Sequence, residues 1–187
     1  MKFTLLNILC LILLASCSTS RPIKSNLTTK YLRSDWPHWS DQDKNCLDTR
    51  AEILKQRSLV EVSMNKKGCK VRAGKWKDYY YPEIHNLASK VDIDHLIPLK
   101  HAHETGASQW STSQKEKFAN DPENLVITNR SYNRQKGAKG IDEWLPLHKD
   151  YSCKYIADWI RLKTKYHLTI RPTEKQSIDS LKRDCRF

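Results

Sequence analysis

The sequence predicts an α+β fold, because helical and strand-like patterns occupy separate stretches of the chain. Residues 46–58 repeat apolar side chains with the spacing of one helical face. Residues 69–83 are rich in β-branched and aromatic side chains around a central glycine, which is typical of a strand or hairpin. Residues 151–185 have the pattern of two helices, which we expect to form a C-terminal helical hairpin.

The N-terminal stretch has the features of a secretory signal followed by a linker. In residues 1–16, Lys2 precedes a mostly apolar run that is shorter than the ~20 residues a membrane-spanning helix needs. Residues 17–34 are polar without an apolar period, and we expect them to form a flexible tether. The 187-residue length then leaves one modest domain, at residues 35–187.

The end of this signal, Leu14 to Cys17, resembles the lipobox of bacterial lipoproteins. The resemblance implies that Cys17 is lipidated and becomes the first residue of the mature chain, so that a lipid anchor holds the protein on a membrane. Ser18 follows the cysteine, which in Gram-negative cells favours the outer membrane or cell surface. Secretion without an anchor is the alternative.

Four cysteines remain after the signal and Cys17 are set aside, which in an exported chain indicates two disulfides with three possible pairings. We expect Cys46–Cys69 and Cys153–Cys185, because antiparallel C-terminal helices bring the last two cysteines together. A structural zinc site is the alternative, but the chain has no C-x-x-C spacing.

The charge of the chain favours a polyanionic partner. Its 33 basic and 21 acidic residues give a net charge of +12 at pH 7. Nucleic acid, anionic lipid and acidic polysaccharide would all be attracted to a chain with this positive charge, so charge alone does not identify the partner.

The central region, residues 91–140, has the order strand, long connection, strand, helix. The strands are expected in residues 92–99 and 123–129, and the helix in residues 130–140. Within the connection, Ser111 and Gln114 have the spacing of a capping box that opens a short helix ending before Pro122.

Three motifs in this region resemble the HNH endonuclease superfamily: DHLIP at 94–98, DPENLV at 121–126 and NRQKG at 133–137. The resemblance implies a ββα-metal (His-Me finger) core of a β-hairpin and a helix around one metal ion. Further similarity to small exported bacterial HNH nucleases, in DTRAE, GASQW and EWLP, extends over residues 35–187.

The resemblance also implies a role for each motif residue. His95 is the general base, since a neutral imidazole can accept a proton from water at pH 7. Asp94 and Asn133 are the ligands of a divalent cation, and their oxygen atoms suit Mg²⁺ or Mn²⁺. Asn124 pins the connection and orients the base. Asp92 shares the strand face of Asp94 and is the rival ligand.

Other polar residues carry weaker signals. Arg50, Arg134 and Lys136 are candidates to bind substrate phosphates, with a structural ion pair or a solvated helix face as the alternatives. His101 and His103 lie in the connection without a ligand motif, and the stretch is not H-E-x-x-H. We therefore do not expect them to bind the catalytic metal directly.

These observations predict a monomeric, metal-dependent HNH endonuclease that hydrolyses phosphodiester bonds in DNA, or also RNA, without sequence preference. No recognition module is evident, so binding should be driven by phosphate contacts. The alternatives are an envelope lipoprotein that binds nucleic acid or another polyanion without catalysis, and a zinc hydrolase that uses His95, His101 and His103.

Overall fold

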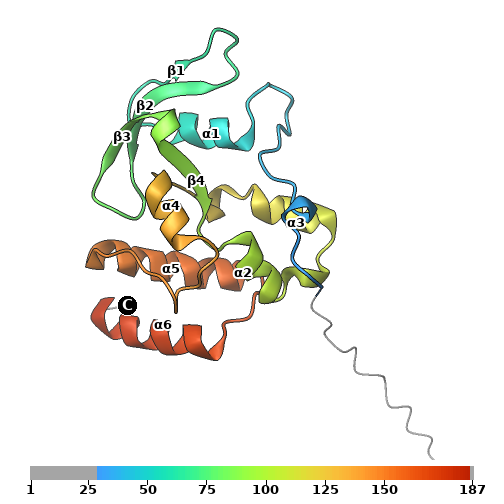
Figure 1. Ribbon diagram of the computed structural model, residues 1–187, viewed down its shortest axis with the longest axis vertical. Helices are drawn as coiled ribbons and strands as arrows, with labels where there is room; N and C mark the ends of the chain where they lie inside the picture. The colour runs from blue at the N-terminus through green and yellow to red at the C-terminus, as the bar shows by residue number, and fades with distance from the viewer. Residues whose placement is uncertain (1–28, 186–187) are drawn as a thin grey trace, which may run out of the picture.

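The computed structural model describes residues 29–185, and it has the expected α+β architecture. The predicted signal, the lipidation site Cys17 and most of the predicted tether lie outside these residues. A three-stranded sheet and α1 lie at one end of the molecule and helices α5 and α6 at the other, with β4 and α4 between them (Figure 1). Within residues 29–185, no helix is long and apolar enough to cross a membrane.

The regular elements of the described chain have the following bounds. The strands are β1 Ser63–Met64, β2 Val71–Lys77, β3 Ile84–Leu87, β4 Val91–His95 and β5 Leu125–Asn129. The α-helices are α1 Thr49–Gln56, α2 Leu99–Glu104, α3 Thr112–Ala119, α4 Arg130–Lys136, α5 Lys149–Lys165 and α6 Pro172–Cys185. Short 3₁₀ turns occur at η1 Arg33–Asp35, η2 Ala88–Lys90, η3 Ala107–Gln109 and η4 Pro122–Asn124.

Strands β1, β2 and β3 form an antiparallel sheet that packs on α1. Trp76 of β2 is fully buried, and its indole N–H donates a hydrogen bond of 2.7 Å to the carbonyl of Leu54 in α1. A buried indole needs such a partner to offset the loss of water. The predicted strand-rich region and the predicted first helix are therefore both confirmed, and they form one core with each other.

Strands β4 and β5 form a separate antiparallel pair, on which α4 packs. In their register Asp94 is opposite Val126, and His95 is opposite Leu125. The pair separates two apolar cores: Ile93 faces the core shared with α1 and β2, whereas Val126 faces the core shared with α5 and α6. The pair thus holds the ends of β4 and β5 between two packed layers.

Strand β4 is shorter than the predicted strand, because pairing stops at His95. The next residues bind the connection instead: the backbone N–H of Leu96 donates to the carbonyl of Asn124 at 2.7 Å. Pro98 then precedes α2. Farther along the connection, the capping box of Ser111 and Gln114 is confirmed at the start of α3.

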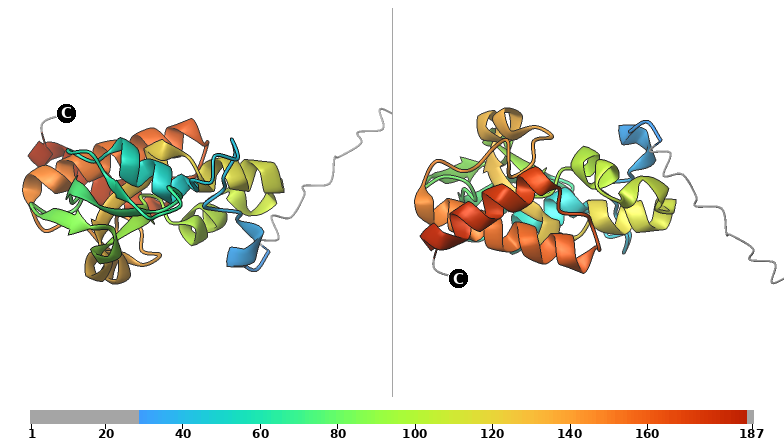
Figure 2. Two further views of the ribbon diagram at one scale, coloured as in Figure 1. Left: turned by 90° about the horizontal axis from the view of Figure 1, so that it is seen from above. Right: turned by 90° about the horizontal axis from the view of Figure 1, so that it is seen from below.

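Helices α5 and α6 form the expected C-terminal hairpin and lie side by side (Figure 2). Both predicted disulfides, Cys46–Cys69 and Cys153–Cys185, are present. Helix α6 begins at Pro172, and the carboxylate of Glu174 in its first turn accepts the backbone N–H of Arg171 at 2.8 Å.

The last part of the predicted tether is not a free linker, because residues 29–34 pack on the domain. The carbonyl of Thr29 binds Nε2 of His103 at 2.5 Å, and the ring of Tyr31 lies edge-on to the same imidazole. Just beyond, Trp36 is buried against Trp110 and Phe118. The polar composition did not predict this packing, because it depends on two aromatic residues separated by other side chains.

Candidate active site

A cavity of about 290 Å³ lies where β4 ends beside α4. Asp94 and His95 from β4 and Asn133 from α4 all line it, although Asn133 is distant from the other two in the sequence. Antiparallel pairing places the end of β5 beside the start of β4. Helix α4 follows β5 directly and packs back along the pair, so that its last residue, Lys136, reaches Asp94 and the carbonyl of His95. The three motif residues therefore share one site.

The imidazole of His95 is buried and held by a single backbone carbonyl. Its Nε2 lies 2.8 Å from the carbonyl oxygen of Ala119, at the end of α3. A carbonyl can only accept a hydrogen bond, so Nε2 carries the proton and the neutral ring has its lone pair on Nδ1. Trp39 stacks on the ring, with centroids 5.8 Å apart.

The electrostatic environment keeps His95 neutral. Burial lowers the pKa of His95 from its usual 6.5 to about 3, and the positive charges of Arg33 and Lys136 act in the same direction. The hydrogen bond to Ala119 opposes these effects only in part. At neutral pH the ring is therefore in the form that can accept a proton.

This lowered pKa makes a prediction about stability. The unfolded chain, with a histidine pKa near 6.5, binds the proton better than the folded chain, so stability should fall as pH drops from 6.5 toward 3. Between pH 6.5 and 5 the His95 contribution should be a loss of about 1.5 kcal/mol in the free energy of unfolding. Urea unfolding of wild type and His95→Asn in EDTA measures it. Parallel pH profiles for the two proteins would contradict the buried neutral imidazole.

Asn124 fastens the chain immediately after His95. Its side-chain oxygen accepts from the backbone N–H of Ile97 at 2.8 Å, and its side-chain nitrogen donates to the carbonyl of Ile97 at 3.3 Å. Because Asn124 is fully buried, these bonds are not exchanged for water. The geometry fits the orienting role that the sequence predicts for this residue.

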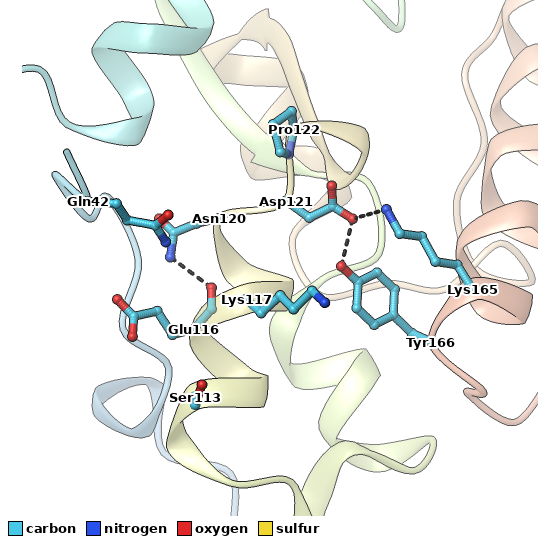
Figure 3. A pocket seen from close by; sticks show the side chains of 9 residues that line it. All are labelled: Gln42, Ser113, Glu116, Lys117, Asn120, Asp121, Pro122, Lys165 and Tyr166. Carbon is cyan, nitrogen blue, oxygen red and sulfur yellow. Dashed lines mark hydrogen bonds and ion pairs between the residues drawn. The ribbon is translucent and has the colours of Figure 1, made fainter.

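The two residues that follow Ala119, Asn120 and Asp121, are held by side-chain contacts (Figure 3). Asn120 donates to the carbonyls of Pro37 and Glu116, and the carboxylate of Asp121 accepts from Lys165 and Tyr166. The pocket beside these side chains is lined in part by groups that are already hydrogen-bonded, among them Asn120, Asp121, Lys165 and Tyr166. We interpret it as a support for the His95 loop.

Asp94 has one carboxylate oxygen engaged by the protein. Its Oδ2 accepts a hydrogen bond of 2.6 Å from the hydroxyl of Tyr80 and lies 2.8 Å from Nζ of Lys136. Both of these contacts use Oδ2, so neither occupies Oδ1, which remains available as a ligand atom. Sequence reasoning missed Tyr80, because its run of three tyrosines indicated only packing.

Asn133 is oriented by Asp92. The side-chain nitrogen of Asn133 donates to Oδ2 of Asp92 at 3.1 Å, which leaves the amide oxygen as the free end. Asp92 also pairs with Arg130 and is absent from the cavity lining. Asp92, which the sequence also offered as a metal ligand, is therefore a hydrogen-bond partner of Asn133. One carboxylate and one amide oxygen are hard ligands that fit Mg²⁺ or Mn²⁺.

The three expected phosphate-binding residues have different environments. Lys136 is fully buried, and its ammonium binds Asp94 and the carbonyl of His95, so it is not placed to contact a phosphate. Burial lowers its pKa, which the charge of Asp94 opposes. Arg50 donates to the carbonyls of Ala88 and Val91, a structural role. Arg134 is exposed on α4.

The two other histidines of the connection lie away from the cavity lining. His101 is buried with Glu174 and Lys163, and His103 binds the carbonyl of Thr29. Among the described residues, these two histidines do not group with His95 as potential metal ligands.

A separate group of potential metal ligands lies in the turn between β2 and β3. Ligand atoms of Asp78, Glu83 and His85 are within 4.8 Å of one another. The Asp78 carboxylate, however, already accepts from Thr128 and from the backbone N–H of Asn129, as well as binding His85. We interpret this group as a structural link between that turn and β5.

Comparison with known proteins decides the family of the chain. Residues 48–177 match the family model described as "GmrSD restriction endonucleases, C-terminal domain". The chain belongs to this family. The GmrSD C-terminal domain supports membership in the HNH nuclease superfamily, and a nuclease family implies a nucleic-acid substrate. The match includes all three motifs but begins after the segment that carries Arg33 and Trp39.

A fungal relative extends the comparison over nearly the whole chain. An "Uncharacterized secreted protein" from Arthroderma benhamiae is 34% identical over 180 residues, which cover 91% of this chain and 86% of the relative. No solved structure matches. The two disulfides of this GmrSD-type domain and the secreted relative together indicate an exported protein.

Proposed function

We propose that the protein is an exported, metal-dependent HNH endonuclease that hydrolyses phosphodiester bonds in DNA without sequence preference. The observation that carries this proposal is the shared cavity of a buried neutral imidazole and two side chains with free oxygen atoms, His95, Asp94 and Asn133. Strands β4 and β5 and helix α4 then correspond to the β-hairpin and helix of a ββα-metal core. RNA is a second substrate to be tested beside DNA.

Each residue has a defined role in the proposed reaction. Nδ1 of His95 accepts a proton from water, the water oxygen bonds to phosphorus, and the bond from phosphorus to the 3′ oxygen breaks. A divalent cation held by Asp94 and Asn133 would neutralise charge on the phosphate and the leaving oxygen. Tyr80 and Lys136 fix the Asp94 carboxylate, and Asn124 fixes the chain after His95. The departing 3′ oxygen keeps the bonding electron pair and takes a proton from solvent water, so the products carry 5′-phosphate and 3′-hydroxyl ends.

The proposed cellular location rests on the N-terminal sequence, which lies outside the described residues. We propose export through the signal at residues 1–16 and a lipid anchor at Cys17 on an outer membrane or cell surface. Secretion without an anchor is the alternative, and the fungal relative is described as a secreted protein. We propose a monomer.

A supercoiled-plasmid assay tests the activity. The purified protein should nick the plasmid with Mg²⁺ or Mn²⁺, lose this activity in excess EDTA and regain it when metal is added back. Asn133→Ala should raise the metal concentration for half-maximal activity by at least about tenfold, since it removes a ligand. Gln135→Ala, on the same helix and exposed, is the matched control and should behave as wild type.

The same assay separates the competing functions. DNA binding without cleavage under every divalent metal would favour a non-catalytic polyanion-binding protein and reject the proposal. Activity that requires zinc and disappears in His101→Ala would favour the three-histidine hydrolase, although the burial of His101 beside Lys163 argues against it.

A further inference from the structure

The segment before the family domain contributes a positive charge to the candidate site. Arg33, in the turn η1, lines the same cavity as Asp94, His95 and Asn133. The family match begins at residue 48, so Arg33 belongs to an extension of the shared domain. Figure 1 shows this extension running beside α3 toward α2, which follows the end of β4.

The extension is anchored on both sides of Arg33. On one side the carbonyl of Thr29 binds His103, and on the other side Trp36 is buried in the main core. Beyond Trp36, Asn120 binds the carbonyl of Pro37. These contacts tie the turn to the connection that also orients His95, so the position of Arg33 relative to the base is fixed by packing.

Among the described residues, no acidic side chain forms an ion pair with Arg33. Arg130, Arg161 and Arg171 each pair with a carboxylate, but no carboxylate among residues 29–185 lies within ion-pair distance of the Arg33 guanidinium. Its guanidinium lies 3.4 Å from Nε2 of His38, whose Nδ1 lies 2.8 Å from the carbonyl oxygen of Trp36. Asp94, which precedes the base in the chain, is already paired with Lys136. An exposed guanidinium beside a nuclease cavity suits a bidentate phosphate contact.

From this placement we infer that Arg33 binds the phosphodiester backbone of the nucleic acid and holds the scissile phosphate in the cavity beside His95. This inference rests on the proposed function and adds a substrate-binding residue to it. It also replaces Lys136, whose ammonium is buried, as the cation available to the phosphate. The extension is then part of the enzyme's substrate-binding surface.

A binding measurement tests Arg33 without requiring catalysis. In the His95→Asn background and in EDTA, Arg33→Gln should weaken binding of a fluorescent DNA duplex by about tenfold. The slope of log Kd against log salt should fall by about 0.9, the value for one lost phosphate contact. Arg72→Gln, an exposed arginine on β2 with the same change in charge, is the matched control and should keep the slope. Arg33→Lys should keep the slope but recover only part of the affinity.

Kinetics and stability separate the possible results. In the active protein, Arg33→Gln should raise KM for plasmid, and its melting temperature should equal that of Arg72→Gln. Equal salt slopes and equal KM for the two variants would overturn the role of Arg33 while leaving the proposed function intact. Normal DNA binding by wild type without cleavage would reject the proposed function, yet a lower slope in Arg33→Gln would still support the phosphate contact. Absence of any DNA binding would overturn both.

Discussion

Replacing His95 by asparagine should slow plasmid nicking by about 10²–10⁴-fold, the usual contribution of a positioned general base. An amide does not accept a proton from water at neutral pH, whereas its NH₂ group can still donate a hydrogen bond to the carbonyl of Ala119. The loss should appear in kcat, because His95 acts on the attacking water and Arg33 is the residue inferred to bind substrate. Single-turnover cleavage at saturating Mn²⁺ measures it.

The control for this variant is His167→Asn. His167 is exposed, is absent from the cavity lining, and has a positive φ of 51°, a conformation that asparagine tolerates. It should cleave at the wild-type rate. Undiminished cleavage by His95→Asn would show that another group activates the water and would remove the main support for the HNH mechanism.

Replacing Glu174 by glutamine should lower the free energy of unfolding by about 3–5 kcal/mol, the cost of leaving a buried charge without its partner. Glu174 is fully buried and lies 3.3 Å from Nζ of Lys163 and 3.1 Å from Nε2 of His101. Burial alone raises the pKa of Glu174, but the hydrogen bonds from His101 and Arg171 and the charge of Lys163 lower it to about 2. The stabilising charge is therefore fully present above pH 4.5 and is lost toward pH 2.

Urea unfolding at pH 7 compares this variant with Glu104→Gln. Glu104 pairs with Lys100 on the surface of α2, so its loss should cost less than about 1 kcal/mol. Adding Lys163→Met to Glu174→Gln should recover part of the stability, because the unpaired ammonium is removed. Equal losses for the two single variants would contradict the idea that the Glu174 network stabilises the helical end of the molecule.

Local sequence patterns predicted the parts of the site that depend on neighbouring residues. The adjacent Asp94 and His95, the capping box at Ser111 and the α4 residue Asn133 each lie in a short motif with its own physical meaning. The disulfide pairing followed from the expected antiparallel helices, and it is confirmed. Secondary structure and motif order, read together with the resemblance to HNH endonucleases, therefore gave the outline of the candidate site.

Partners that meet only after folding were not predictable in this way. Lys136 lies three residues after Asn133, so its motif position suggested substrate, but packing of α4 on β4 buries its ammonium beside Asp94. Tyr80 and Arg33 reach the site from distant segments whose composition carried no catalytic signal. Tertiary packing decides which residues meet, and whether a charged group faces the substrate or is buried in an ion pair. The pattern of a single sequence does not specify this packing.

The disulfide between Cys153 and Cys185 makes the stability of the C-terminal helical hairpin depend on the oxidation state of the surroundings. It closes a span of 32 residues, a constraint typically worth about 3–4 kcal/mol. In reducing cytosol that constraint is absent, and α6 is held by its packing on α5 and by the contacts of Glu174 with Lys163 and His101. The proposed nuclease would therefore reach its full stability only after export, away from the chromosome of the producing cell.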